Sequence, residues 1–313
     1  MKNKILWIST GGTFSCIETK NGLSPASDNE FMKKIVEDNK EIKNFADITF
    51  SGLFNIDSTE MDFDKIKAIA NEINKEINNY DGILITHGTD TMAYTCALLS
   101  VMIENPPVPI VLSGSQKPYF CENTDAKKNF KNAIYALCNK KLRCVCVVFD
   151  KSIFHGLDCT KSSSTDIDAF SAYDKPLGVI KNGKAEILIE DIIKTGEYKF
   201  FPDICDKVAL IKINPFFDES IIDCYIKKGI KGFVIEGYGV GGIPGRVIEK
   251  LKKAKDKDIY SLLISQCKNG GTDLSIYEVG KNAASAGIAD GKKLGVEGAL
   301  ALMMKNISNK QFS

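Results

Sequence analysis

One stretch of the sequence constrains the fold of this chain most. It begins as a buried strand, breaks at a glycine and continues as a helix. Residues 83–86 read Ile-Leu-Ile-Thr, which is typical of a strand buried on both faces. Gly88 breaks this run, and residues 92–100 then carry apolar side chains at helical spacing. In α/β proteins, ligands bind at such strand ends, on the carboxyl edge of a parallel sheet. Thr89 and Asp90 lie at this turn, where they could belong to a site or simply cap the helix.

The same strand–turn–helix unit recurs through the first part of the chain. Strands are predicted at residues 4–8, 48–53, 110–112 and 144–149, and helices at residues 29–39, 62–78 and 129–137. Residues 15–28 are polar and rich in turn formers, which predicts a mobile loop beside the first strand end. Alternating strands and helices predict a doubly wound, mostly parallel sheet.

The length of the chain, 313 residues, favours two domains over one compact core. A shorter α/β pattern occupies the second part, with strands at 208–213, 232–236 and 259–265 and helices at 220–228 and 246–255. Between the two parts, residues 181–205 lose clear periodicity. We therefore predict a larger N-terminal catalytic domain over 1–180, an interdomain connection over 181–205 and a smaller C-terminal α/β domain over 206–313.

Composition restricts the partners and the compartment. A net charge of +1 argues against nucleic acid or an anionic membrane as the main partner. The ten cysteines are scattered and form no Cys-x-x-Cys pair, which disfavours a disulfide framework or a zinc site and favours a reducing cytoplasm. We also expect neither a signal peptide nor a membrane-spanning segment, because no apolar run approaches about 18 residues.

Small polar residues follow four of the predicted strands. The first strand leads into Thr10-Gly11-Gly12-Thr13, the second into Asn55-Ile56-Asp57-Ser58-Thr59, the third into the Gly88-Thr89-Asp90 turn and the fourth into Ser113-Gly114-Ser115-Gln116. Two consecutive glycines allow a sharp turn and a close approach of the backbone to a ligand. These strand ends are the candidate site.

Other catalytic and binding motifs fit less well. Residues 237–242 match Gly-x-Gly-x-x-Gly, but the next strand ends in Ser265-Gln266-Cys267 without the acid that holds a ribose. A turn that needs positive φ explains these glycines better. The chain has no Gly-x-Ser-x-Gly elbow and only two histidines, His87 and His155, which leaves few members for a triad or a metal site. We interpret His87 as structural.

With those motifs set aside, the catalytic chemistry that the residues still support is that of a threonine nucleophile. Its hydroxyl is weak unless a base removes the proton during attack, and a lysine can serve if burial lowers its pKa from about 10.4. A neighbouring carboxylate would fix that lysine while raising its pKa, so burial has to oppose it. Thr13, Thr89, Asp90 and Lys161 supply these groups, although Lys161 could equally be a solvated surface residue. The sequence alone leaves open whether they meet.

The two threonine motifs together, Thr10–Thr13 and His87–Tyr94, resemble the bacterial asparaginase family, most closely its cytoplasmic type I L-asparaginases. The remaining strand-end motifs, Lys161 ahead of residues 168–170 and the glycine-rich 237–242 segment fall in the family's order. The similarity spans nearly the whole chain.

The resemblance implies a role for each site residue. Thr13 would be the nucleophile that forms an acyl-enzyme, and Thr89, Asp90 and Lys161 would relay protons and activate water. Ser58 and Asp90 would bind the α-carboxylate and α-amino group of the substrate, with backbone N–H groups of Thr89 and Ser115 as oxyanion donors. The other substrate-binding positions implied are Gly12, Asp57, Thr59 and Gly88.

One departure concerns a tyrosine that many family members carry in the mobile loop. Leu23 lies about where that tyrosine is expected, so either this branch activates Thr13 differently, or Tyr238 or another group replaces the tyrosine. The resemblance otherwise predicts a cytoplasmic homodimer or homotetramer that hydrolyses L-asparagine to L-aspartate and ammonia, without metal or cofactor.

Two alternatives remain. One is the related amidotransferase subunit that releases ammonia from glutamine for charged transfer RNA. We expect it less, because those subunits carry an additional N-terminal domain and Thr10 leaves no room for one. The other is a non-catalytic amino-acid-binding regulator, which the complete set of Thr13, Thr89, Asp90 and Lys161 disfavours.

Overall fold

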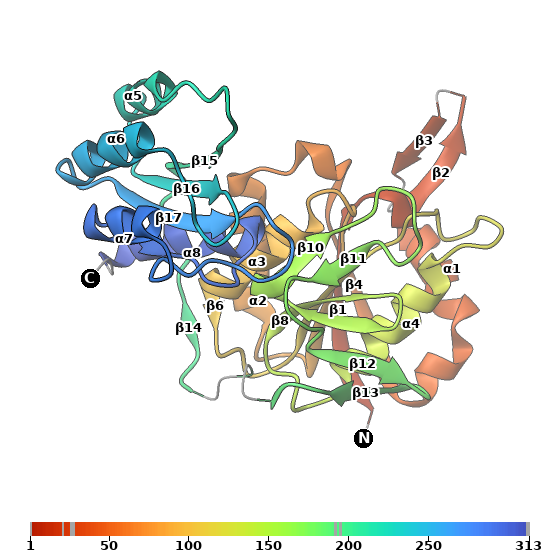
Figure 1. Ribbon diagram of the computed structural model, residues 1–313. Coiled ribbons are helices and arrows are strands. Elements are labelled where there is room, and N and C mark those ends of the chain that lie inside the picture. Colours follow the sequence, from red (N-terminus) through yellow and green to blue (C-terminus); the bar gives the residue numbers. More distant parts are fainter. Residues whose placement is uncertain (1, 21, 26–28, 191–192, 194–195, 311–313) are drawn as a thin grey trace. The chain divides into compact units, whose positions relative to one another are not determined.

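The chain divides into two compact units, Met1–Pro202 and Asp203–Ser313. The computed structural model describes residues 2–20, 22–25, 29–190, 193 and 196–310, with residues 18, 19, 23–25 and 29 described by their backbone alone. Each unit contains a sheet with helices packed on it (Figure 1). Among the described helices, none combines the length and the apolar content that a bilayer-crossing segment requires.

The first unit is organised on an eight-stranded mixed sheet of order β13-β12-β9-β8-β7-β5-β1-β4. Its strands are β1 (Asn3–Gly11), β4 (Ala46–Ile56), β5 (Gly82–Thr86), β7 (Ile110–Ser113), β8 (Val145–Phe149), β9 (Ser152–His155), β12 (Gly178–Lys181) and β13 (Lys184–Ile187). The strands from β4 to β8 pair in parallel, and the strands from β8 to β13 pair antiparallel. The prediction of a mostly parallel α/β sheet is confirmed, with an antiparallel edge added to it.

Helices cover both faces of this sheet. On one face, α1 (Asn29–Asp38) and α4 (Ala126–Leu137) share an apolar cluster with the strands, in which the rings of Trp7 and Phe130 lie 4.8 Å apart. Alternate strand residues such as Ile8 and Ile85 are also fully buried, because successive side chains point to opposite faces. The second layer is α3 (Met92–Met102), which packs on β7 and β8, with α2 (Phe63–Glu76) beside it.

The segment predicted as an interdomain connection, 181–205, mostly belongs to the first unit. Strand β13 forms a hairpin with β12, and Asn182 and Gly183 between them have φ values of 51° and 71°. An Asn-Gly pair with two positive φ angles is the preferred two-residue hairpin turn. Further on, β14 (Lys199–Phe200) pairs with β6 (Ile103–Glu104). These edge strands lack the long apolar run of a central strand, so periodicity did not reveal them.

The polar segment after the first strand also differs from the expected loop. Its residues form an antiparallel hairpin of β2 (Cys16–Thr19) and β3 (Gly22–Pro25). Residues 26–28 and the side chain of Leu23 lie outside the described part of the chain. What replaces the family's loop tyrosine therefore stays a prediction.

The second unit is a smaller α/β unit, as predicted. Its parallel sheet consists of β15 (Val208–Lys212), β16 (Gly232–Gly237), β17 (Tyr260–Ser265) and β18 (Ala289–Asp290). One face packs against α5 (Ser220–Lys227), α6 (Gly245–Lys255) and α7 (Glu278–Ser285), and the other against α8 (Val296–Asn309). The sequence had predicted no element after residue 265, so β18, α7 and α8 are additions.

Candidate active site

Three turns that follow β1, β4 and β5 touch one another through glycines. Gly12 has φ 76° and ψ 178°, a conformation that is essentially restricted to glycine. A Cβ on Gly12 would lie 2.4 Å from both N and Cα of Gly88, and a Cβ on Gly88 would lie 2.5 Å from Oγ of Ser58. Backbones approach this closely only where neither carries a side chain. Thr13 directly follows Gly12, and Thr89 directly follows Gly88. The two threonines therefore belong to turns that are in direct contact.

Thr13 begins a short 3₁₀ helix, η1 (Thr13–Ser15), and is partly buried. The carbonyl of Gly12 accepts hydrogen bonds from the N–H of Ser15 at 3.1 Å, from its hydroxyl at 3.2 Å and from the thiol of Cys16 at 3.4 Å. Burial, and secondarily the Asp57 carboxylate, raise the pKa of the Cys16 thiol, which keeps it a protonated donor at neutral pH. These bonds fix the peptide that carries Thr13.

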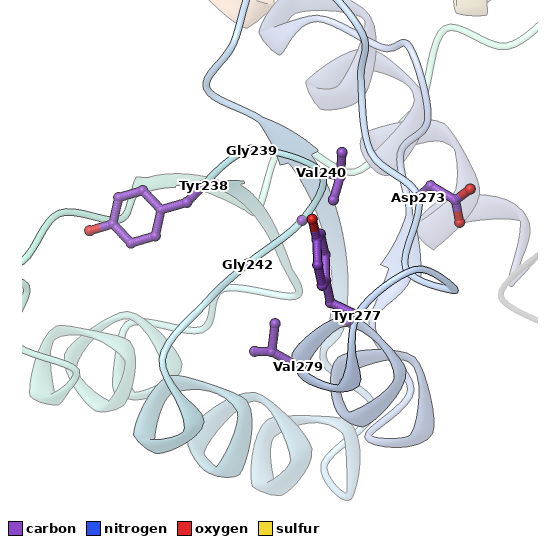
Figure 2. Close-up of a pocket in the computed structure, with 9 residues that line it drawn as sticks. Tyr238, Gly239, Val240, Gly242, Asp273, Tyr277 and Val279 are labelled. Carbon is purple, nitrogen blue, oxygen red and sulfur yellow. The ribbon is translucent and has the colours of Figure 1, made fainter.

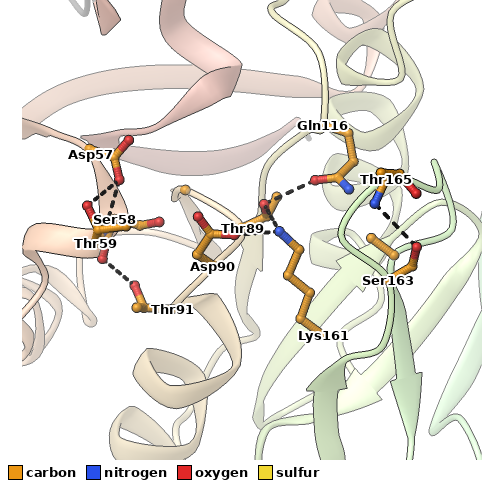
Figure 3. A network of polar contacts seen from close by, with 12 residues as sticks. Asp57, Ser58, Thr59, Thr89, Asp90, Thr91, Gln116, Lys161, Ser163 and Thr165 are labelled. Carbon is orange, nitrogen blue, oxygen red and sulfur yellow. Dashed lines mark hydrogen bonds and ion pairs between the residues drawn. The ribbon is translucent and has the colours of Figure 1, made fainter.

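Thr89, Asp90 and Lys161 form one hydrogen-bonded group (Figure 3). Lys161 ends β10 (Cys159–Lys161), and its amine donates to Oγ1 of Thr89 at 2.8 Å and to Oδ1 of Asp90 at 2.6 Å. The Lys161 side chain is 17% exposed, while that of Asp90 is 59% exposed. The lysine is therefore not a solvated surface residue. Its amine is held by an alcohol and a carboxylate from the turn after β5.

The turn after β4 carries the next group of predicted residues. The Asp57 carboxylate accepts the N–H and the hydroxyl of Thr59, both at 2.8 Å, and these bonds lower the pKa of Asp57. Ser58, which begins η3 (Ser58–Glu60), is buried, and its carbonyl accepts the Thr91 hydroxyl at 2.8 Å. Asp57 thus shapes the turn, and Thr91 ties Ser58 to the start of α3.

His87 is fully buried, and both of its ring nitrogens are engaged within the fold. Nδ1 lies 2.7 Å from the Gly88 carbonyl, and Nε2 lies 3.0 Å from the Thr95 hydroxyl. Because a carbonyl only accepts, Nδ1 carries the proton and Nε2 accepts from Thr95. Burial lowers the pKa of His87 to about 4. The contacts are those expected of a neutral structural residue, as the sequence had suggested.

The turn after β7 carries Ser115, a predicted oxyanion donor, and Gln116, a strand-end residue to which the sequence assigned no role. Ser115 is buried, and its hydroxyl donates to the Lys117 carbonyl at 2.5 Å. Next to it, Oε1 of Gln116 accepts the Thr89 hydroxyl at 3.1 Å. The sequence placed Gln116 at a strand end like the other site residues, but it did not show the contact with Thr89.

The glycine-rich segment 237–242 lines a pocket of about 220 Å³ in the second unit, together with Asp273, Tyr277 and Val279 (Figure 2). Gly239 and Gly241 have φ values of 50° and 119°, so the predicted positive φ explains these two glycines. Gly237 is required by close packing instead, because a Cβ there would lie 2.8 Å from Cδ1 of Leu263 and 2.9 Å from the Gly242 carbonyl oxygen. At the end of β17, the Gln266 amide donates to two backbone carbonyls of the sheet. This residue joins strands rather than presenting an acid to a ribose.

Candidate metal ligands are not grouped in the part of the chain that the structure describes. No three His, Cys, Asp or Glu side chains there could hold one metal ion between them. The ten cysteines are free thiols, five of them buried in the first unit: Cys16, Cys96, Cys144, Cys146 and Cys159.

The fold and the site together define a class: an α/β protein with hydroxyls, an amine and a carboxylate gathered at the carboxyl edge of a mostly parallel sheet. Comparisons identify the family. A model of the asparaginase N-terminal domain matches residues 4–192, and a model of the glutaminase/asparaginase C-terminal domain matches residues 207–311. This chain belongs to the asparaginase family.

Its relatives include two kinds of protein. The chain is 32% identical to an L-asparaginase of Thermococcus kodakarensis, over 96% of this chain and 92% of that protein. It is 33% identical to a glutamyl-tRNA(Gln) amidotransferase subunit of Methanosarcina acetivorans, over 96% of this chain and 73% of that protein.

Solved structures agree with this assignment. The thermostable L-asparaginase of Thermococcus kodakarensis superposes with a TM-score of 0.88 at 31% identity, covering 97% of this chain and 92% of the other. A probable cytoplasmic L-asparaginase of Campylobacter jejuni gives a TM-score of 0.83 at 25% identity, covering 98% of this chain and 95% of the other.

Proposed function

We propose that this protein hydrolyses L-asparagine to L-aspartate and ammonia through a threonine nucleophile. The observation that carries the proposal is the Lys161 amine, held 2.8 Å from the Thr89 hydroxyl and 2.6 Å from the Asp90 carboxylate. The contact between Gly12 and Gly88 brings the turn that bears Thr13 against the turn that bears this group. Membership of the asparaginase family supports the choice of substrate.

The reaction proceeds in two halves. In the first, the Thr13 oxygen bonds to the side-chain amide carbon of asparagine, and the C–N bond then breaks. The proton of the Thr13 hydroxyl passes to the nitrogen, which leaves as ammonia, and an ester joins Thr13 to the aspartyl group. In the second half, water attacks the ester carbon while Thr89 and Lys161 accept its proton, and Thr13 recovers its hydrogen on release of aspartate.

The remaining residues bind the substrate. Ser58 receives the α-carboxylate, and the largely exposed Asp90 carboxylate has room to receive the α-amino group. Backbone N–H groups of Thr89 and Ser115 serve as oxyanion donors, each worth a few kcal/mol in the transition state. Gly12 and Gly88 let the turns that contact the substrate approach one another, and Asp57 and Thr59 keep the turn around Ser58 in shape.

We further propose a cytoplasmic homodimer or homotetramer that uses no metal or cofactor. The free thiols and the similarity to the probable cytoplasmic enzyme of Campylobacter jejuni support the compartment. Gel filtration with light scattering measures the oligomer, and a protein that stays monomeric would contradict this part of the proposal.

Ammonia release from asparagine tests the reaction. Thr13→Ala and Thr89→Val should each abolish hydrolysis while the far-UV spectrum and the melting temperature are retained. Thr165→Ala is the matched control, because Thr165 is exposed and donates to the Ser163 hydroxyl through its backbone N–H, which the substitution keeps. Near-normal turnover in either site variant would refute the assigned roles.

The amidotransferase subunits among the relatives define a second candidate, in which glutamine is the ammonia donor. Parallel assays with asparagine and glutamine separate the two candidates. Release of ammonia from glutamine alone would support the amidotransferase function. Binding of asparagine with no release from either amide would instead point to a regulator.

A further inference from the structure

Gln116 links the Thr89 hydroxyl to the loop that follows Lys161. Its Oε1 lies 3.1 Å from the Thr89 hydroxyl oxygen, and its Nε2 lies 3.2 Å from the carbonyl oxygen of Asp166. The loop itself is closed by the N–H of Ser162, which donates to the Ala169 carbonyl at 2.8 Å. One amide side chain therefore contacts both a proposed catalytic hydroxyl and the segment that continues from the proposed catalytic lysine. Figure 3 shows the first of these contacts, between Gln116 and Thr89.

The backbone of Gln116 is held independently of its side chain. Asp125, just before α4, accepts the N–H of Gln116 at 2.9 Å and the N–H of Lys117 at 3.0 Å. Asn129 donates to the same carboxylate at 3.1 Å and to the Gly114 carbonyl at 2.9 Å. Replacing the Gln116 side chain leaves these bonds intact, so the turn after β7 should keep its path.

The direction of each hydrogen bond follows from the groups involved. The Asp166 carbonyl only accepts, so the NH₂ end of the amide faces it and the oxygen end faces Thr89. That oxygen also only accepts, so the Thr89 hydroxyl donates to Gln116. The Lys161 amine then donates to a lone pair of the same hydroxyl oxygen. In this arrangement the Thr89 oxygen is fixed from two sides, and its proton points away from Lys161.

Two consequences of this contact oppose each other. The Gln116 oxygen competes with Lys161 for the Thr89 proton. One neutral hydrogen bond changes an equilibrium constant by about 5- to 10-fold, which is the size of this unfavourable effect. It also keeps the Thr89 oxygen at Lys161, and a misplacement of about 1 Å costs on the order of 100-fold in rate. Positioning is the larger effect.

We propose that Gln116 is a positioning residue for the Thr89–Lys161 pair, acting through its amide on the Thr89 oxygen and anchoring the loop after Lys161. This inference rests on the proposed hydrolysis of asparagine. It predicts an effect on turnover rather than on substrate binding, because Gln116 contacts Thr89 and the loop, while binding is assigned to other groups.

Gln116→Met tests the inference, since methionine is unbranched and of similar length but cannot make either bond. We expect kcat to fall about 10- to 100-fold while KM stays within about 2-fold, because uniform binding is untouched. Gln116→Asn keeps the amide but is one methylene too short to reach both partners, so it should lose kcat in the same way. In a Thr13→Ala background, which prevents turnover, calorimetry should give equal affinities for L-aspartate with and without Gln116→Met.

Two control variants isolate the amide. Lys117→Met makes the same replacement at the exposed neighbouring position, and Asp166→Ala keeps the backbone carbonyl that Gln116 uses. Both should retain wild-type kcat. A wild-type kcat in Gln116→Met, a change confined to KM, or an equal loss in either control would overturn the inference. If the wild type releases no ammonia from asparagine, the proposed function itself is wrong. If the wild type is active and the Gln116→Met variant is equally active, only this inference is wrong.

Discussion

Replacing Gly12 by alanine should damage both stability and turnover, because two separate requirements at this position exclude a side chain. The first is conformational: φ 76° with ψ 178° costs a residue other than glycine about 1–3 kcal/mol. The second is steric. The new methyl group would lie 2.4 Å from the Gly88 backbone, whereas ordinary contacts begin at 3.4 Å, so one turn has to move by about 1 Å.

The two costs set the expected magnitude. Forced overlap in a packed region costs about 1–3 kcal/mol, so Gly12→Ala should lower the free energy of unfolding by roughly 4 kcal/mol in total. A displacement of about 1 Å between the turns that bear Thr13 and Thr89 should lower kcat on the order of 100-fold. Both effects arise from one added carbon atom.

Gly229→Ala is the matched control. Gly229 has φ 84°, yet a Cβ there would meet nothing within 4 Å, so it reports the cost of positive φ alone, roughly 1 kcal/mol. Urea denaturation followed by circular dichroism gives the stabilities, and ammonia release gives kcat. If Gly12→Ala loses no more stability than Gly229→Ala and keeps its turnover, the close approach of the two turns is wrong.

Two further predictions concern the neighbours of this contact. Gly88→Ala places a methyl group 2.5 Å from Oγ and 2.6 Å from Cβ of Ser58, so rotation of the hydroxyl does not relieve the overlap and Ser58 itself has to shift. Since its hydroxyl is assigned to the substrate carboxylate, KM should rise about 10- to 100-fold, and an unchanged KM would remove Ser58 from the binding site. His87 should make stability depend on pH: its pKa is about 4 when folded and 6.5 when unfolded, so the unfolded state binds the proton first and the free energy of unfolding should fall by about 2 kcal/mol from pH 7 to pH 5. Urea titrations at both pH values measure this loss, which should be smaller in His87→Gln; equal losses in the two proteins would show that His87 is not its source.

The central strands could be predicted because burial on both faces leaves a simple pattern in the sequence. The strand expected from residue 83 is β5 (Gly82–Thr86), and the strand expected at 110–112 is β7 (Ile110–Ser113). Elements at the edges were missed because their pattern is mixed. Helix α8 (Val296–Asn309) was missed for a different reason: it is buried around much of its circumference, including Glu297 and Lys305, and such a helix lacks the polar face that marks amphipathic spacing.

The residue types of the candidate site could be predicted, but their contacts could not. Lys161 and Thr89 are separated by 72 positions, and nothing in local spacing indicates that their side chains meet. Gly12 and Gly88 bring together the turns that bear Thr13 and Thr89, whereas Lys161 reaches Thr89 from the end of a short strand, β10, that pairs with β11 (Phe170–Ala172). The family resemblance supplied this pairing, since residue chemistry alone left Lys161 open as a surface residue.

The direction of the Thr89 O–H bond could not be predicted from the sequence, because it depends on which groups surround the hydroxyl in the folded protein. The Asp166 carbonyl can only accept, so the Gln116 NH₂ faces it and the Gln116 oxygen, which also only accepts, takes the Thr89 proton. The proposed reaction needs the opposite arrangement, with Thr89 giving its proton to Lys161. Turnover therefore includes a rotation of the Thr89 O–H bond from Gln116 toward Lys161. A solvent isotope effect on kcat that changes in Gln116→Met is the expected signature, and identical isotope effects in the two proteins would exclude a rate contribution from this rotation.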